Sequence, residues 1–133
     1  MFGVTRVIHF CYGHRLLGYG GKCRHPHGHN GKIELTLRRG ALDKLGMVMD
    51  FEEIKKTVEK WVEAELDHKM LLNNKDPLVK TLRDMGEPVV AMAGNPTAEN
   101  IARLIYDNAK KRRLPVASVR LWETVNSFAE YGR

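Results

Sequence analysis

The alternation of apolar and polar residues from 27 to 38 limits the possible folds of this chain more than any other feature. Its apolar members are Ile33, Leu35 and Leu37. An apolar residue at every second position predicts a strand with one buried face. The same phase extends back to His29 and His27, so both histidines share that face if no bulge intervenes, and Gly28 between them relieves crowding. The strand therefore carries two imidazoles at the end of a buried face.

A third histidine makes this part of the chain a candidate metal site. His14, His27 and His29 match the three protein ligands of a catalytic zinc site, in which a fourth position stays open for water or substrate. His14 comes from an earlier segment, which suits a site closed between two parts of the chain. The alternative is that the histidines cap turns or lie on the polar surface, as we expect for His9 and His25, and His25 could also replace one ligand.

The rest of the sequence predicts an α+β fold in a single domain, residues 1–133. The expected strands cover residues 4–10, 27–38, 119–125 and 127–131, and the last two form a hairpin. The expected helices run from Asp50 to near Asp67 and from Thr97 to Leu114, each with a capping residue at its start. Between them, residues 78–85 could form a short helix and residues 88–92 an extended segment. We expect two helices on one face of a mostly antiparallel, four-stranded sheet.

The formal net charge of +6 suggests an anionic partner. The one dense basic run, residues 110–113, falls where a helix is expected to end, and positive charge there complements the helix dipole. The sequence has no stripe of interleaved aromatic and basic residues and no recognition-helix pattern. Nucleic-acid binding is therefore not expected. A basic nucleic-acid-binding protein is the non-enzymatic alternative.

The chain carries no signal for export or for membrane insertion. The first ten residues lack a basic segment followed by a long apolar one, and no stretch approaches the length of a membrane span. We therefore expect no membrane association and a cytoplasmic location. Cys11 and Cys23 are expected to be free thiols, because a reducing compartment and the lack of a larger cysteine framework argue against a disulfide.

Four further residues are candidates for chemistry. Cys23 lies close to His27, and a thiolate near a metal and an imidazole can act as base or nucleophile; the alternatives are a fourth zinc ligand or a plain loop residue. Asp67 can orient His68 and raise its basicity, although such a pair at a helix end also serves capping. Glu123 falls on the apolar side of its strand, so it either meets a buried partner or ligand or lies at an edge facing water.

Six short motifs follow one another along the chain, and they are Phe10-Cys11-Tyr12-Gly13-His14-Arg15, Cys23-x-x-x-His27-Gly28-His29, Met49-Asp50-Phe51, Leu66-Asp67-His68, Asn95-Pro96-Thr97-Ala98-Glu99-Asn100 and Trp122-Glu123-Thr124. With them the chain resembles, over nearly its whole length, the family of 6-pyruvoyltetrahydropterin and 6-carboxytetrahydropterin synthases. The resemblance implies the tunnelling fold, with an antiparallel four-stranded sheet and two helices packed on one face.

The resemblance also implies catalytic roles. The Zn²⁺ ligands would be His14, His27 and His29. Cys23 would be the thiolate that abstracts a proton, and Asp67 with His68 would form a relay that assists it. Zinc would act as a Lewis acid at the side-chain hydroxyls of the substrate.

The same resemblance implies the residues that hold the substrate. Glu123 would anchor the pterin ring, because a carboxylate can accept hydrogen bonds from its amino group and ring nitrogen. Thr97 and Glu99 would lie near the same pocket. Lys22 and Arg24 are candidates for binding a triphosphate, by charge and proximity alone.

Three residues between the cysteine and the His-Gly-His are typical of the 6-carboxytetrahydropterin branch of queuosine biosynthesis, whereas the pyruvoyl branch tends to have a longer gap. The implied substrate is 7,8-dihydroneopterin triphosphate, and the implied products are 6-carboxy-5,6,7,8-tetrahydropterin, acetaldehyde and triphosphate. The alternatives are a 6-pyruvoyltetrahydropterin synthase or a related pterin aldolase. A zinc hydrolase is a weaker reading, since it leaves Cys23 and Glu123 without a role.

Family members assemble as hexamers, dimers of trimers, with active sites at subunit boundaries, and the resemblance implies the same here. Asp67, His68 or Glu123 could then serve the Cys23 of a neighbouring subunit. The chain departs from the family at residues 11–13, where many members carry small alanines, and at Trp122, where a lysine is common. Residues 69–94 are also more numerous than in compact bacterial members. The substituted positions predict a different pocket lining, and the longer segment bears on substrate preference more than on the metal site or the fold.

Overall fold

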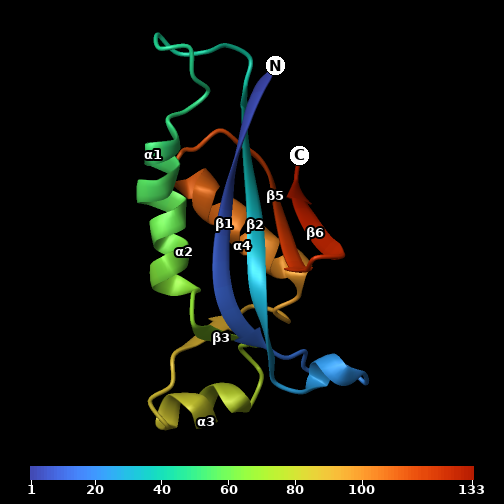
Figure 1. Cartoon of the computed structure of the whole chain (residues 1–133). Helices are drawn as coiled ribbons and strands as arrows, with labels where there is room; N and C mark the ends of the chain where they lie inside the picture. The colour runs from blue at the N-terminus through green and yellow to red at the C-terminus, as the bar shows by residue number, and fades with distance from the viewer.

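The computed structural model describes all 133 residues. Its centre is a six-stranded sheet in the order β4-β3-β1-β2-β5-β6 (Figure 1). The strands are β1 (Phe2–His14), β2 (His27–Arg39), β3 (Lys69–Asn73), β4 (Val89–Met92), β5 (Val116–Thr124) and β6 (Ser127–Gly132). The pairs β1–β2, β2–β5 and β5–β6 are antiparallel, whereas β3 runs parallel to β1 and β4 runs parallel to β3.

The β1–β2 ladder is the longest in the sheet and sets the position of the histidines. Its register runs from Phe2 opposite Arg39 to His14 opposite His27 without a bulge. The alternation expected from the sequence therefore holds along the whole of β2, and His27 and His29 lie on the same face as Ile33. Alternate residues along each of these strands point to this face and are the more buried ones. His14 is one of them and is only 2% exposed.

The helices are α1 (Phe51–Ile54), a π-helical turn η2 (Lys55–Glu59), α2 (Lys60–Glu65), α3 (Leu78–Asp84) and α4 (Ala98–Lys111), and a 3₁₀ turn η1 covers Lys22–Arg24. The two predicted caps are confirmed. The Asp50 carboxylate accepts from the N–H of Glu52 at 2.9 Å, and the Thr97 hydroxyl accepts from the N–H of Asn100 at 3.2 Å. None of the helices is both long and apolar enough to cross a lipid bilayer.

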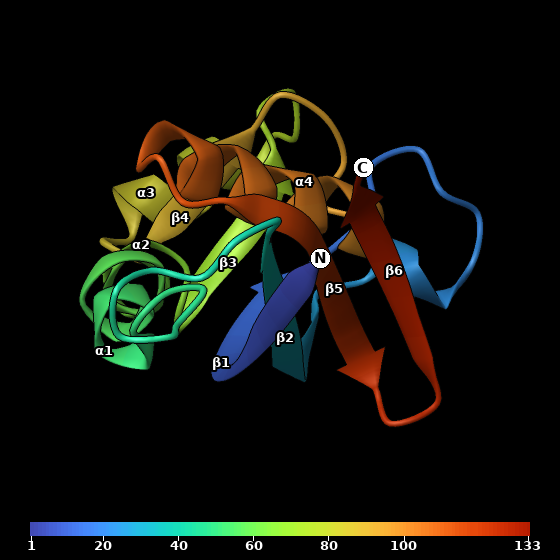
Figure 2. The ribbon, with the colours of Figure 1, turned by 90° about the horizontal axis from the view of Figure 1, so that it is seen from above.

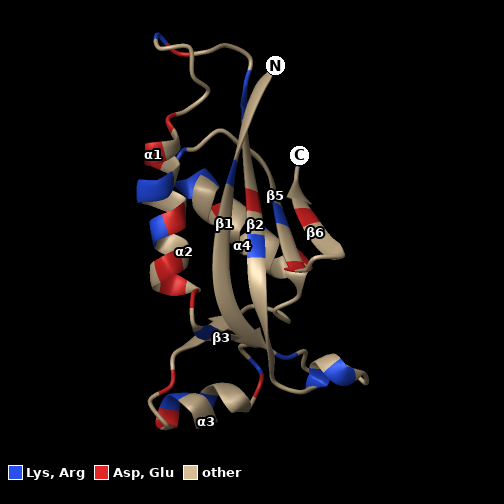
Figure 3. Ribbon diagram, viewed as in Figure 1, with Lys and Arg blue, Asp and Glu red and all other residues tan.

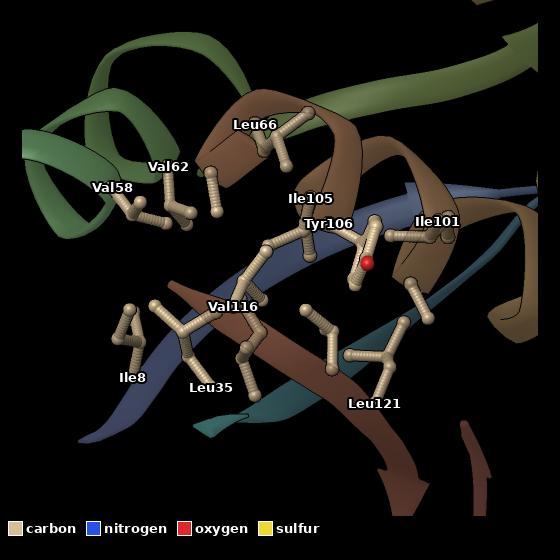
Figure 4. Close-up of a cluster of buried hydrophobic side chains, with 14 of the residues drawn as sticks. Ile8, Leu35, Val58, Val62, Leu66, Ile101, Ile105, Tyr106, Val116 and Leu121 are labelled. Atoms are coloured by element: carbon tan, nitrogen blue, oxygen red, sulfur yellow. The ribbon is translucent and has the colours of Figure 1, made fainter. Parts of the chain in front are cut away.

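The core fills the space between the sheet and the helices on one of its faces. Viewed from above, α2 and α4 lie on the same side of β1, β2 and β5 (Figure 2). Val58 and Val62 of the α1–α2 segment and Ile105 of α4 converge on Ile8 and Leu35 of the sheet (Figure 4). All of these side chains are at most 1% exposed, so this face provides the main hydrophobic stabilisation of the fold.

The α+β class is confirmed, but the sheet has six strands instead of the expected four and is mixed. Both additional strands, β3 and β4, come from the segment 69–94. The short helix and the extended segment expected there are confirmed as α3 and β4. The sequence did not predict β3, because Met70, Leu71 and Leu72 form a short continuous apolar run without the alternation that identifies a strand.

Candidate functional site

Three imidazoles meet at the end of the β1–β2 hairpin. His14 is the last residue of β1, His27 lies opposite it, and His29 follows on the same face of β2. The ring nitrogens that could bind an ion all lie within 4.8 Å of one another. The structure thus brings together the three histidines that the sequence singled out, and it leaves His9 and His25 outside the cluster.

Two of these rings are held by backbone carbonyl groups. His14 Nδ1 lies 2.7 Å from the carbonyl oxygen of Pro96, and His27 Nδ1 lies 2.7 Å from that of His25. An Nδ1–H that donates to a carbonyl fixes the tautomer in which the Nε2 lone pair is free for a metal. Burial lowers the pKa of His14, and this outweighs the opposing effects of Pro96 and the Glu123 charge, so the ring is neutral. Neutral imidazole is the form that binds a metal.

Glu123, near the end of β5, turns inward toward the same point. Its Oε2 lies 2.9 Å from His29 Nε2 and 3.6 Å from His14 Nε2. Of the two alternatives left open by the sequence, a buried partner or an edge facing water, the structure shows the buried partner. The three imidazole nitrogens form a donor set that suits a divalent cation such as zinc, and the carboxylate lies beside them as a hydrogen-bond acceptor.

Two cavities flank this cluster. The larger, of about 800 Å³, is lined by His27 and His29 together with His68. The smaller, of about 510 Å³, is lined by Glu123 and Glu99, which were predicted to share a pocket. Thr97 was predicted near the same pocket, but its hydroxyl caps α4 and it is not among the lining residues.

Asp67 and His68 form a pair between α2 and β3. Asp67 Oδ2 lies 2.9 Å from His68 Nδ1, and the N–H of Cys11 donates to Asp67 Oδ1 at 2.8 Å. Burial raises the pKa of Asp67, but the hydrogen bonds from Cys11 and His68 outweigh it and lower the pKa, which keeps the carboxylate charged. His68 has φ of 60°, a left-handed conformation that costs on the order of 1 kcal/mol in a residue other than glycine.

The two free thiols lie in different surroundings. Cys23 is partly exposed in η1, where its carbonyl accepts from the N–H of Leu16 at 2.8 Å. It does not line the cavity that contains His68. Cys11 does line that cavity, and its Sγ lies 3.0 Å from Asn30 Oδ1. Within one chain, the structure does not place Cys23 beside Asp67 and His68.

A polar network that the sequence did not reveal holds the segment between His14 and Cys23. Asn95 accepts from the N–H of Leu17 at 3.0 Å and from Asn73 Nδ2 at 3.1 Å, and its own amide donates back to the Leu17 carbonyl. Asn95 therefore positions the start of this segment. It also positions the adjoining Pro96, whose carbonyl oxygen contacts His14 Nδ1. Its place in the Asn95-Pro96-Thr97 motif was the only signal in the sequence.

Arg15 and Asp76 form the second anchor of the same segment. Arg15 Nε donates to Asp76 Oδ2 at 2.7 Å, a second guanidinium nitrogen contacts Oδ1, and the N–H of Leu78 donates to Oδ1 at 2.8 Å. The Asp76 side chain is fully buried. The hydrogen bond from Arg15 lowers the pKa of Asp76 despite the opposing effect of burial. Residues 69–94 thus support the loop that carries Cys23.

Asp76→Asn is expected to lower the free energy of unfolding by about 2 kcal/mol near neutral pH, because it removes a charge-assisted contact to Arg15. A folded-state pKa below the unfolded one stabilises the protein above about pH 4 and loses that effect as the pH falls. The difference between the two proteins should therefore shrink on acidification. Urea denaturation at several pH values measures it.

The exposed pair of Lys80 and Asp84 provides the matched control for this experiment. Asp84 is 63% exposed on the side chain, so Asp84→Asn should change the unfolding free energy by less than about 0.5 kcal/mol. An equal and pH-independent loss in both variants would contradict the assigned role of Asp76.

Residues of both charges are distributed along the whole ribbon, on helices, strands and loops (Figure 3). Lys22 and Arg24, the residues predicted to bind the triphosphate, lie together in η1. Lys110 and Lys111 occupy the last turn of α4, as expected from the helix-dipole argument.

The chain belongs to the 6-pyruvoyl tetrahydropterin synthase family, whose family model matches residues 3–133. The chain is 38% identical to the 6-carboxy-5,6,7,8-tetrahydropterin synthase of Rickettsia typhi, with 98% of this chain and 99% of the relative aligned. It is 36% identical to the 6-pyruvoyl tetrahydrobiopterin synthase of Pongo abelii, with 96% and 89% aligned. A solved structure of an uncharacterized protein from Wolinella succinogenes superposes with a TM-score of 0.81 at 26% identity, covering 99% and 98% of the two chains. The fold is therefore the tunnelling fold of this family, as expected.

Proposed function

We propose that this protein is a zinc-dependent 6-carboxy-5,6,7,8-tetrahydropterin synthase. It acts as a lyase that converts 7,8-dihydroneopterin triphosphate to 6-carboxytetrahydropterin, acetaldehyde and triphosphate. The observation that carries the proposal is the meeting of three imidazoles and the Glu123 carboxylate at one point between two cavities. Full-length similarity to a relative named for this activity supports it. The three-residue gap between Cys23 and His27, typical of this branch, also supports it.

Zn²⁺ fits the imidazole cluster as its metal. Its protein ligands would be His14, His27 and His29, which together offer three nitrogen donors. When bound, zinc supplies a Lewis acid that draws electron density from oxygens of the substrate side chain. The carbonyls of Pro96 and His25 hold two of the rings in the tautomer that metal binding needs.

Cys23, Asp67 and His68 move the protons in this proposal. The Cys23 thiolate takes a carbon-bound proton from the substrate side chain. The Asp67 carboxylate contacts Nδ1 of His68. The other ring nitrogen of His68, Nε2, is then free to exchange a proton with the reacting centre. The left-handed backbone at His68 supports a functional role, because strain of this kind persists where geometry matters more than local stability.

Glu123 anchors the pterin ring by accepting hydrogen bonds from its amino group and ring N–H. Glu99 lines the same cavity and offers a second acceptor, and Thr97 starts the helix that carries Glu99. Lys22 and Arg24 place positive charge next to Cys23 and are the proposed contacts for the triphosphate.

We further propose that the enzyme works as a hexamer, a dimer of trimers, in which a neighbouring subunit supplies Asp67 and His68 to each Cys23. The absence of Cys23 from the cavity that contains His68 supports a site shared between subunits. The two edge strands, β4 and β6, are available for pairing with further copies. On β6, Phe128 exposes 42% of its surface.

A 6-pyruvoyltetrahydropterin synthase is the second candidate, favoured by the 36% identity to the Pongo abelii enzyme. Both reactions release triphosphate. They differ in the product, because the pyruvoyl compound retains all three side-chain carbons whereas the carboxy compound loses two of them as acetaldehyde. The product therefore separates the two candidates.

The test is an anaerobic incubation of the zinc-loaded protein with 7,8-dihydroneopterin triphosphate, followed by mass spectrometry of the pterins and of acetaldehyde. We expect 6-carboxytetrahydropterin and acetaldehyde in equal amounts. Accumulation of 6-pyruvoyltetrahydropterin without acetaldehyde would assign the second candidate. An unchanged substrate in the presence of bound zinc would contradict both.

A further inference from the structure

Tyr12 lies on the buried face of β1, two residues before His14. It is 3% exposed, and its ring stacks on Phe10 at a centroid distance of 4.9 Å. The same ring meets that of His14 edge-on at 5.2 Å and that of His29 at 5.7 Å. Tyr12 is therefore part of the wall of the imidazole cluster, at a position where many family members carry a small residue.

Gly31 leaves room for the Tyr12 ring on β2. A Cβ placed on Gly31 would lie 2.8 Å from Cε1 of Phe10, closer than side chains tolerate, and 3.0 Å from Cε1 of Tyr12, a tight contact that would displace the ring. The ring of Tyr12 thus crosses β2 above Gly31. The β2–β5 ladder ends with Lys32 opposite Trp122, so the next position on β5 beside Gly31 is Glu123. The phenol accordingly extends from β1 toward the side of the cluster where Glu123 lies.

The Tyr12 hydroxyl is buried and has no hydrogen-bond partner in the protein. Nε of Arg6 is the only other buried side-chain nitrogen or oxygen without a hydrogen-bond partner. The Arg6 guanidinium still donates to both carboxylate oxygens of Glu59. The hydroxyl is the sole polar group of Tyr12, so its side chain has no such compensation. An unpaired buried hydroxyl is destabilising, and phenylalanine would fill the same space without the penalty.

We propose that Tyr12 is a substrate-binding residue whose hydroxyl donates a hydrogen bond to an acceptor on the pterin ring. This inference rests on the proposed function. On a pterin whose amino edge is held by Glu123, the ring carbonyl oxygen and N5 follow on the ring between that edge and C6, the carbon that carries the side chain. Both are acceptors, and the Tyr12 hydroxyl is the unpaired donor on that side of the cluster.

Tyr12→Phe is the direct test, because it removes the hydroxyl and keeps the ring over Gly31. The measurements are fluorescence titration of the zinc-loaded protein with 7,8-dihydroneopterin, zinc content, and the unfolding midpoint of the ligand-free protein. We expect the dissociation constant to rise about 5- to 10-fold, as for the loss of one buried hydrogen bond. Zinc content should stay the same, and the midpoint should stay the same or rise.

Tyr106→Phe is the matched control, since Tyr106 is 6% exposed and packs on Tyr131, away from the imidazoles. It should bind 7,8-dihydroneopterin like the wild type. Equal binding by Tyr12→Phe and wild type would overturn the inference and leave the proposed function in place. A lower unfolding midpoint with unchanged binding would also overturn it and assign the hydroxyl a structural partner. If the wild type itself binds no pterin, the proposed function fails and the inference fails with it.

Discussion

Cys23→Ala is expected to lower kcat about 10²- to 10⁴-fold, the usual contribution of a positioned general base. Zinc content and the unfolding midpoint should remain at wild-type values, because Cys23 is partly exposed in a short turn and lies outside the imidazole cluster. The measurement is the steady-state rate with 7,8-dihydroneopterin triphosphate, together with metal analysis and thermal denaturation of the same preparation. A variant with normal zinc and stability but no turnover would identify a residue that acts in the chemistry.

Cys11→Ser is the matched control for this prediction, because it changes the other thiol of the chain. Cys11 is the other free thiol, and within one chain it is the one that lines the cavity of His68. Serine can keep the contact to Asn30, and the backbone contacts of Cys11 with Asp67 and His68 do not depend on its side chain. We expect Cys11→Ser to stay within about twofold of the wild-type rate, in line with its lack of a part in the proposed proton transfer. The opposite result, with Cys23→Ala active and Cys11→Ser inactive, would move the base to Cys11 and confine the relay to one subunit.

The part of the site that follows strand periodicity could be predicted from the sequence. Side chains on a strand alternate strictly, so the phase of Ile33 also fixes the side on which His29 and His27 lie. The antiparallel ladder then brings His14 opposite His27. The caps at Asp50 and Thr97 were predictable for a similar reason, since a helix start depends on residues within one turn of it.

Other parts of the site depend on contacts that leave no pattern in the sequence. The carbonyl of Pro96 orients the ring of His14, a residue 82 positions away in the sequence. Every residue has a backbone carbonyl, so the sequence does not show which one makes this contact. Asp76 reaches Arg15 from a segment whose strand β3 has no alternation to reveal it. The inward turn of Glu123 was left open, because the sequence does not show whether β5 is an edge strand. It lies between β2 and β6.

The same reasoning explains why the hydroxyl of Tyr12 could not be recognised in the sequence. An aromatic residue on the buried face of a strand is ordinary core material, and Tyr12 stacks on Phe10 as such residues do. Only the missing hydrogen-bond partner separates it from a packing residue. A missing contact is a property of the folded surroundings, so it becomes visible only when every neighbour has been placed.

His27→Ala is expected to reduce zinc affinity by more than about 100-fold and to abolish turnover. Loss of an outer partner of a metal ligand already costs about 10- to 100-fold in affinity, and removal of a ligand itself costs more. His27 is less buried than His14, so the fold should tolerate the substitution. Metal analysis after dialysis against a weak chelator measures the first effect, and the product assay measures the second.

His25→Ala is the matched control for the metal prediction, since His25 is the alternative ligand that the sequence left open. Its ring lies outside the cluster, and its Nε2 lies 3.3 Å from Arg24 Nε. Only its backbone carbonyl supports His27, and alanine keeps that carbonyl. His25→Ala should therefore retain zinc and activity. Loss of zinc in His25→Ala and its retention in His27→Ala would show that the rings exchange roles when the metal binds, and that the Pro26 segment rearranges to bring His25 inward.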